Sequence, residues 1–159
     1  MRWTGARHTD KPTVEVRTWI DAPPERVWAL VSDIGLVPGT SHGLRSVEWL
    51  DGATGPAVGS RFLGRGSHEA CGEWITTSYV IECEPCRVLA WAVRDPTEPS
   101  EVWRFRLHAG DGGTELSEWV QLVPGRSGLE EKIVFVRLRE FEHTMTATLK
   151  HIKHLAETG

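Results

Sequence analysis

The chain has 159 residues, of which 40% are hydrophobic and 25% are charged, proportions that suit a single globular domain with one core. Its formal net charge of −4 argues against a nucleic-acid partner, because phosphate binding needs a basic face. No apolar run approaches the ~20 residues that cross a bilayer, and the N-terminal MRWTGARHTDK lacks the apolar core of a secretory signal. We therefore expect a cytoplasmic protein without membrane insertion.

The first third of the chain predicts one strand and one or two helices. Residues 1–11 are polar and aperiodic, which indicates a flexible arm ahead of a single domain over residues 12–159. From Pro12 to Ile20 apolar and polar residues alternate, a pattern typical of a half-buried strand. The double proline and the acid of DAPPE then suit the first turn of a helix. Glycine and proline between Asp33 and His42 leave room for at most one short second helix.

The rest of the chain predicts six strands and a long terminal helix. The strands are expected at Leu44–Leu50, Val58–Ser67, Glu73–Glu84, Val88–Asp95, Val102–His108 and Glu115–Val123. AGDGGT, between the last two, is a strong hairpin signal, and consecutive strands joined by turns predict an antiparallel meander. Ser127–Glu130 is a plausible capping box for a helix with one apolar face. Such a helix would cover the concave face of the sheet. We predict an α+β fold of about seven strands in β-α-α-β6-α order.

Eight tryptophans against one tyrosine are the unusual feature of the composition. Tryptophan lines pockets well because it is large and carries a single donor, although several rings can simply fill a core. Their spread over almost every predicted strand favours an internal pocket.

No metal or cofactor is expected. Cys83 and Cys86 form a CxxC, but no second ligand pair follows at zinc spacing, and Pro85 places the motif in a turn. Free thiols are the preferred interpretation. His151 and His154 lie one helical turn apart, but flanking lysines favour a solvated face.

Eight segments in a characteristic order resemble the START-like or helix-grip superfamily (SRPBCC, Bet v 1-like), and are most similar to its polyketide cyclase/dehydrase and lipid-transport branch. They are IDAPPERVWALVSD, VEWLDG, VGSRFLGRG, EWITTSYVIECEP, RVLAWAV, VWRFRL, GGTELSEW and TLKHIKHLAE, and they cover the chain from residue 12 onward. The resemblance implies a curved antiparallel sheet wrapped around the C-terminal helix, with a cavity for a hydrophobic small molecule. It implies no fixed reaction, because members bind lipids, hormones or polyketides and only some are catalysts.

Two departures lie where the resemblance places the ligand. VPGTSHGL lacks the aromatic residue common after the first helix, and Gly66 stands where relatives often have asparagine. A relative's substrate therefore does not transfer to this chain.

Strand parity and the helical apolar stripe predict which residues face the cavity. Gly64 and Gly66 would leave empty volume beside larger apolar side chains. The predicted ligand-binding residues are Phe62, Gly64, Gly66, Trp74, Thr76, Ser78, Trp91, Trp103, Phe105, Leu116, Leu138, Phe141 and Met145.

Two residues are candidates for acid/base chemistry. Glu118, among Trp74, Trp91 and Trp103, would be poorly solvated, and its raised pKa would suit a general acid or base. Pairing with an arginine, or solvation at the strand end, is the alternative. The resemblance places His42 in the loop that borders the cavity mouth, and histidine titrates near neutrality, although a lone loop histidine is more often a surface residue.

The sequence thus favours a cofactor-independent polyketide cyclase or dehydratase of bacterial secondary metabolism. A non-catalytic carrier or sensor of a lipid-like or aromatic metabolite is the alternative. Trp19 and Trp119 share an outward parity and could mark a homodimer surface, with plain packing on the convex face as the other interpretation.

Overall fold

The computed structural model describes residues 11–39, 44–68, 72–123 and 131–158. Its strands are β1 (Thr13–Ile20), β2 (Leu44–Trp49), β3 (Arg61–His68), β4 (Gly72–Glu84), β5 (Val88–Val93), β6 (Glu101–Gly110) and β7 (Gly113–Leu122). Its helices are α1 (Pro24–Val31), the 3₁₀ helix η1 (Ile34–Gly39) and α3 (Glu131–Thr158). Residues 1–10 of the expected arm, His42 and the proposed capping box at 127–130 lie outside the described residues.

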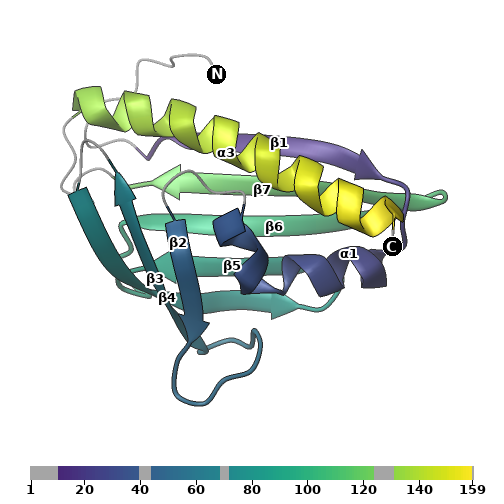
Figure 1. Cartoon of the computed structure of the whole chain (residues 1–159), viewed down its shortest axis with the longest axis horizontal. Coiled ribbons are helices and arrows are strands. Elements are labelled where there is room, and N and C mark those ends of the chain that lie inside the picture. Colours follow the sequence, from purple (N-terminus) through teal and green to yellow (C-terminus); the bar gives the residue numbers. More distant parts are fainter. Residues whose placement is uncertain (1–10, 40–43, 69–71, 124–130, 159) are drawn as a thin grey trace.

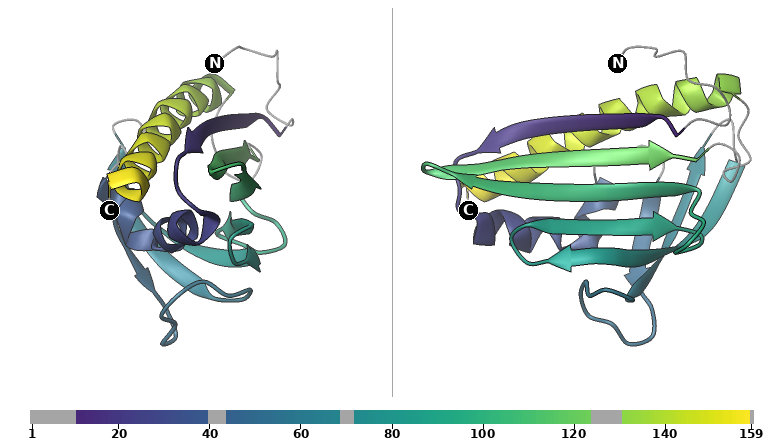
Figure 2. Two further views of the ribbon diagram at one scale, coloured as in Figure 1. Left: turned by 90° about the vertical axis from the view of Figure 1, so that its right-hand side faces the viewer. Right: turned by 180° about the vertical axis from the view of Figure 1, so that it is seen from behind.

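All seven strands belong to one antiparallel sheet in the order β1-β7-β6-β5-β4-β3-β2. Strands β2 to β7 form a continuous meander, and β1 closes one edge by pairing with β7 along its whole length. The sheet is strongly bent, and α1, η1 and α3 all lie on its concave side (Figures 1 and 2). The predicted helix-grip fold and its element order are confirmed.

Most strand boundaries lie within two residues of the predicted ones, and two strands are shorter than predicted because the backbone leaves the extended region. The strand expected from Val58 begins at Arg61, since Gly59 has a φ of 93° and the Val58 side chain is 68% exposed. The strand expected to reach Asp95 ends at Val93, since Arg94 has a φ of 76°. In both places the positive φ takes the residue out of the extended conformation of a strand.

Helix α3 crosses the concave face along the side of β1 and β7 (Figure 1). Toward its C-terminus Leu149, Ile152 and Ala156 belong to a core cluster with β-strand residues and α1. Further toward its N-terminus a second cluster joins Leu138, Phe141 and Met145 to Val14, Val120 and Leu122. Burial of each large apolar side chain contributes about 1.5–3 kcal/mol. No helix in the described ranges is long and apolar enough to cross a membrane.

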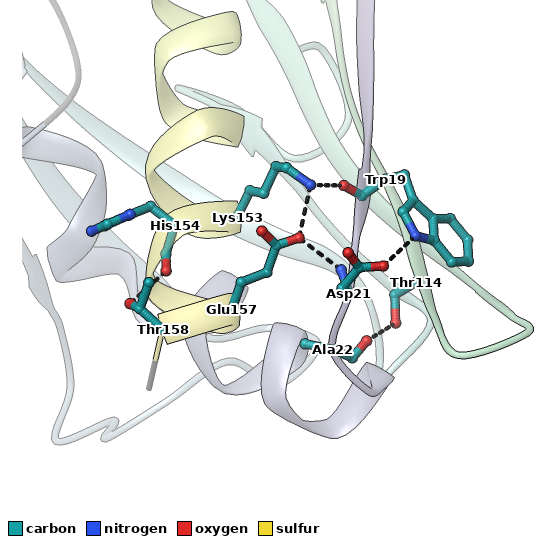
Figure 3. A network of polar contacts seen from close by, with 8 residues as sticks. All are labelled: Trp19, Asp21, Ala22, Thr114, Lys153, His154, Glu157 and Thr158. Carbon is teal, nitrogen blue, oxygen red and sulfur yellow. Dashed lines mark hydrogen bonds and ion pairs between the residues drawn. The ribbon is translucent and has the colours of Figure 1, made fainter.

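Polar contacts tie the C-terminal end of α3 to the junction between β1 and α1 (Figure 3). Lys153 Nζ donates to the Trp19 carbonyl over 2.6 Å and to Glu157 Oε2 over 2.7 Å. Glu157 Oε2 also accepts from the Asp21 backbone N–H at 2.8 Å, and these contacts lower the pKa of the Glu157 carboxyl. The Arg26 guanidinium donates to the carbonyls of Ala156 and Leu155, which lie among the unpaired carbonyls of the last helical turn. We call this set the C-terminal clasp.

The two outward tryptophans do not face each other across the sheet. In the β1–β7 register Trp19 pairs with Glu115, whereas Trp119 pairs with Glu15. Trp119 lies under the Arg104 guanidinium, 4.8 Å from its carbon to the ring centroid, and Trp19 is 42% exposed. A homodimer through this face stays a prediction.

Replacing Gly113 by alanine should destabilise the fold. A Cβ on Gly113 would lie 2.4 Å from the Ile20 carbonyl oxygen and 2.6 Å from Trp19 Cζ2. The carbonyl belongs to the paired backbone of β1, so we expect Gly113→Ala to lower the free energy of unfolding by about 1–3 kcal/mol. Urea unfolding measures it, with Gly55→Ala as the control because a Cβ there meets nothing within 4 Å. Equal unfolding midpoints for the two variants would contradict the close approach.

Candidate functional site

A cavity lies between the concave face of the sheet and the part of α3 from Arg137 to Thr148. The cavity has a volume of about 130 Å³, close to that of an apolar cavity of ~150 Å³ that binds benzene. It is smaller than the ~300–1,000 Å³ typical of pockets for drug-sized ligands and therefore suits a small organic molecule.

Strand parity places most of the predicted residues in the cavity wall. The residues of the predicted set that line it are Phe62, Gly64, Trp74, Thr76, Ser78, Trp91, Trp103, Phe105, Glu118 and Phe141. They meet from β3, β4, β5, β6, β7 and α3 because the register of neighbouring strands keeps one parity on the concave face. The β-bulge between Val80 and Glu82 lies beyond these positions on β4 and therefore does not invert them.

Four residues of the predicted set lie outside the wall. Leu116 is fully buried in the cluster around Ile20 and Val27, below α1. Leu138 and Met145 pack in the second cluster against β1 and β7. Gly66 is buried opposite Leu44 and Trp74, yet does not line the cavity. These residues share a parity or a stripe with cavity residues but are already covered by other apolar side chains.

The aromatic side chains form a continuous wall. Trp49 contacts Phe62 edge-on at 5.6 Å between centroids, and Phe62 contacts Trp91 at 5.7 Å. Trp91 stacks with Trp103 at 6.4 Å and an interplanar angle of 13°. Trp103 then meets Phe141 of α3 edge-on at 5.1 Å. Such a wall offers flat apolar faces to a ring-containing ligand.

Glu118 is the buried carboxyl of the cavity. It lies on β7 between Val16 of β1 and Phe105 of β6, and is 6% exposed. Its Oε1 is buried without a hydrogen-bond partner, the one side-chain atom of which this holds in the described residues. Desolvation raises the pKa of Glu118 from its ordinary 4.5 to about 8. The carboxyl is therefore mostly protonated at neutral pH and within reach of ionisation.

A second acidic residue, Glu101, was not predicted. It lines the cavity from the start of β6, and its Oε1 accepts a hydrogen bond from Trp103 Nε1 at 3.1 Å. Desolvation raises its pKa, while the Trp103 hydrogen bond and the charges of Arg137 and Arg94 act in the opposite direction. Its parity with Trp103 was the signal that could have identified it.

Helix α3 adds a polar edge that was also missed. Arg137, Glu140, Thr144 and Thr148 line the cavity beside Phe141. Arg137, Phe141, Thr144 and Thr148 are spaced by four, three and four residues, so they share one helix face that flanks the apolar stripe. Helical spacing from Phe141 could have found them. Val31, Ile34, Leu44, Val47, Ser67 and Val93 complete the wall.

The remaining candidates of the sequence analysis are His42 and the two cysteines of the CxxC motif. His42 lies outside the described residues, so its role stays a prediction. Cys83 and Cys86 are free thiols, as predicted. Within the described ranges no three histidine, cysteine, aspartate or glutamate side chains cluster as metal ligands.

The helix-grip fold and its aromatic cavity, which holds a buried carboxyl, define a class of cavity-forming proteins. Comparison with known proteins identifies the family. The family model described as polyketide cyclase / dehydrase and lipid transport matches residues 11–157, so the chain belongs to this family. The Polyketide_cyc-like protein Cgl2372 from Corynebacterium glutamicum is 30% identical, with 92% of this chain and 91% of that chain covered and a TM-score of 0.58. No curated protein matches the chain.

Two di-domain ARO/CYC proteins share the fold at lower identity. BexL, from the BE-7585A biosynthetic pathway, is 18% identical, with 98% of this chain and 52% of BexL covered and a TM-score of 0.68. StfQ, from the steffimycin biosynthetic pathway, is 12% identical, with 95% of this chain and 52% of StfQ covered and a TM-score of 0.71. This chain spans about half the length of these two proteins.

Ionisation of Glu118 should make stability depend on pH. Because its folded-state pKa lies above that of an unfolded chain, unfolding between about pH 4.5 and 8 releases a proton. The free energy of unfolding should fall across this range, by up to about 5 kcal/mol, and show no further effect of this group above it. Urea unfolding of wild type and Glu118→Gln at several pH values isolates the effect, since the variant lacks the group. Parallel stability curves for the two proteins would contradict a raised pKa.

Proposed function

We propose that the protein binds an apolar, ring-containing small molecule in its cavity and acts on it as a cofactor-independent polyketide cyclase or dehydratase. The observation that carries the proposal is the buried, unpaired carboxyl of Glu118 in a wall of aromatic side chains. Membership of the polyketide cyclase/dehydrase and lipid-transport family supports it, as do the ARO/CYC proteins that share the fold. A cytoplasmic location remains part of the proposal.

Glu118 suits the role because a purely structural carboxyl would be paired. Buried polar groups in folded proteins are almost always hydrogen-bonded, and an unpaired one costs about 1–3 kcal/mol. A pKa of about 8 keeps both protonation states accessible near neutral pH, which is the property a general acid/base needs. The unpartnered Oε1 and the raised pKa, whose one cause is desolvation, support the acid/base role over pairing with an arginine.

A single carboxyl that accepts and returns a proton is sufficient for cyclisation and dehydration. The Glu118 carboxylate removes a proton from a carbon between two carbonyl groups, and the resulting enolate carbon bonds to a distal carbonyl carbon of the same chain. That carbonyl oxygen takes the proton from Glu118 and becomes a hydroxyl. Removal of a second proton from the same carbon and its delivery to the hydroxyl then release water and leave a carbon–carbon double bond. The cavity contributes by holding the chain folded so that the two carbons meet.

A carrier or sensor is the second candidate, and one observation favours it. A catalytic base is normally oriented by a neighbouring group, and Glu118 Oε1 has no such neighbour in the described residues. In that case the carboxyl would only donate a hydrogen bond to the bound metabolite. Native mass spectrometry of freshly purified protein, with identification of any co-purifying molecule as product or unreacted metabolite, separates the two functions.

Glu118→Gln should abolish turnover and spare binding. Turnover is measured by mass spectrometry as the loss of one water from a linear poly-β-ketone ester, and we expect a decrease of at least about 100-fold. Glutamine keeps the size of the side chain, so affinity for the ester should stay close to that of wild type. Unchanged turnover would remove Glu118 from the mechanism, and tight binding without product in wild type would support the carrier.

The rate should also follow the ionisation of Glu118. Because proton removal comes first, kcat/KM should rise about tenfold per pH unit below pH 8 and level off above it, in line with a pKa of about 8. Initial rates in overlapping buffers between pH 5.5 and 9.5 measure this. A profile that falls over this range would assign the first step to an acid instead.

Enlarging Gly64 should block the cavity. A Cβ at this position makes ordinary contacts, 3.4 Å to Leu44 Cδ1, 3.6 Å to Thr76 Oγ1 and 3.7 Å to Trp74 Cζ3, all from residues of the wall. Alanine is therefore accommodated, whereas the outer atoms of leucine enter the space for the ligand. We expect Gly64→Leu to weaken binding of 2-ethylnaphthalene at least tenfold by isothermal titration calorimetry, and Gly64→Ala to bind nearly as wild type. Equal affinities for the two variants would place the ligand elsewhere.

A further inference from the structure

We propose that Arg137 is a specificity-determining residue, whose guanidinium binds an uncharged carbonyl oxygen of the ligand at the end of the cavity opposite Glu118. The proposal rests on the proposed function in one respect, that the cavity binds an apolar ring-containing molecule. It adds a second polar contact and with it a class of ligand.

The guanidinium is enclosed but poorly satisfied. The Arg137 side chain lines the cavity and is 19% exposed, with its guanidinium carbon 4.6 Å from the centroid of the Phe141 ring. Its ion pair with Glu140 measures 3.8 Å, longer than a hydrogen bond. No hydrogen bond joins it to another side chain in the described part of the chain. A guanidinium carries five N–H donors, so one that lines a cavity is a ready site for an acceptor.

The neighbouring charges favour an uncharged acceptor. Glu140 lies one turn along α3, and Glu101 of β6 is close enough to interact with Arg137 electrostatically. A carboxylate ligand on Arg137 would lie close to the Glu140 carboxylate, and like charges at short range are unfavourable. A ketone or ester carbonyl accepts the same N–H groups without adding negative charge. Glu101 is itself held by the Trp103 indole, so it stays beside the guanidinium.

The distance between Glu118 and the end of the cavity at Glu101 and Arg137 determines the length of ligand that fits. Glu118 pairs with Phe105 on β6, and Glu101 precedes Phe105 by four residues on the same strand. At 3.3 Å per residue the two carboxyl-bearing positions are about 13 Å apart along the sheet. Trp91 and Trp103 stack between them. A flat fused-ring molecule with a carbonyl at one end fits this arrangement, with its reacting atoms near Glu118 and its carbonyl near Arg137.

Three naphthalenes test the proposal by isothermal titration calorimetry: 2-acetylnaphthalene with a carbonyl, 2-ethylnaphthalene without an acceptor, and 2-naphthoate with a carboxylate. Wild type should bind the acetyl compound at least about tenfold more tightly than either of the others, because a hydrogen bond to a charged donor contributes that much or more. Arg137→Met, which keeps the length of the side chain, should remove the preference for acetyl over ethyl and leave the affinity for the ethyl compound unchanged. Arg139→Met is the matched control on an exposed position of the same helix, and should bind all three as wild type does.

Each other outcome overturns a defined claim. Equal loss of affinity for the acetyl and ethyl compounds in Arg137→Met would make Arg137 a packing residue only. Tightest binding of 2-naphthoate by wild type would overturn the uncharged class of ligand. Failure of wild type to bind any of the three would overturn the proposed function, and this inference with it. Should Arg137→Met not fold by circular dichroism, Arg137→Lys replaces it, and it should reduce the acetyl preference because lysine offers a point charge in place of a planar fork.

Discussion

The cavity exists because one helix is too narrow to cover this sheet. An α-helix with its side chains is about 10 Å wide, whereas neighbouring strands are about 4.8 Å apart, so a helix covers roughly two strands. Helix α3 packs along β1 and β7, where Leu138 and Met145 meet the apolar residues of the sheet. The concave surface of the central strands is left uncovered between α3 and the α1–η1 segment. The sheet bends around its concave side (Figure 2), and side chains of that surface line the cavity.

Hydrogen bonds and apolar packing both fix the C-terminal end of α3. The C-terminal clasp and the core cluster below α1 tie one end of α3 to β1 and α1 with hydrogen bonds and buried apolar surface. The part of α3 beside the cavity packs Leu138 and Met145 against β1 and β7 and presents Arg137, Glu140 and Thr144 to the cavity. The buried, unpaired carboxyl of Glu118 on β7 is unfavourable for folding. Contacts elsewhere in the fold have to offset this free-energy cost. Binding and catalytic sites often contain such polar groups, which lower the stability of the fold and line a cavity.

Family membership establishes the fold, whereas the function depends on the side chains that line the cavity. Proteins of one fold carry unrelated functions, and the resemblance to the two ARO/CYC proteins extends to the fold alone at 18% and 12% identity. In this chain a buried carboxyl, Glu118, and a guanidinium, Arg137, line the same aromatic cavity. The proposed ligand, apolar with hydrogen-bond acceptors, follows from these two side chains.

Most of the fold could be predicted from the sequence because it depends on local patterns. Period-two alternation identified the strands and put Phe62, Trp91, Trp103 and Glu118 on the concave face, and the hairpin signal at AGDGGT joined β6 to β7. Only the tertiary structure decided which concave residues border the void. Leu116 and Glu118 share a strand and a parity, yet α1 covers the first and the gap beside α3 exposes the second to the cavity. Likewise, the apolar stripe of the last helix predicted Leu138 and Met145 as ligand contacts. In the structure these two residues pack against β1 and β7, and Arg137 of the same helix lines the cavity. Periodicity predicts which residues share one face of a strand or helix. The position of the cavity along that face depends on how strands and helices distant in the sequence pack against one another.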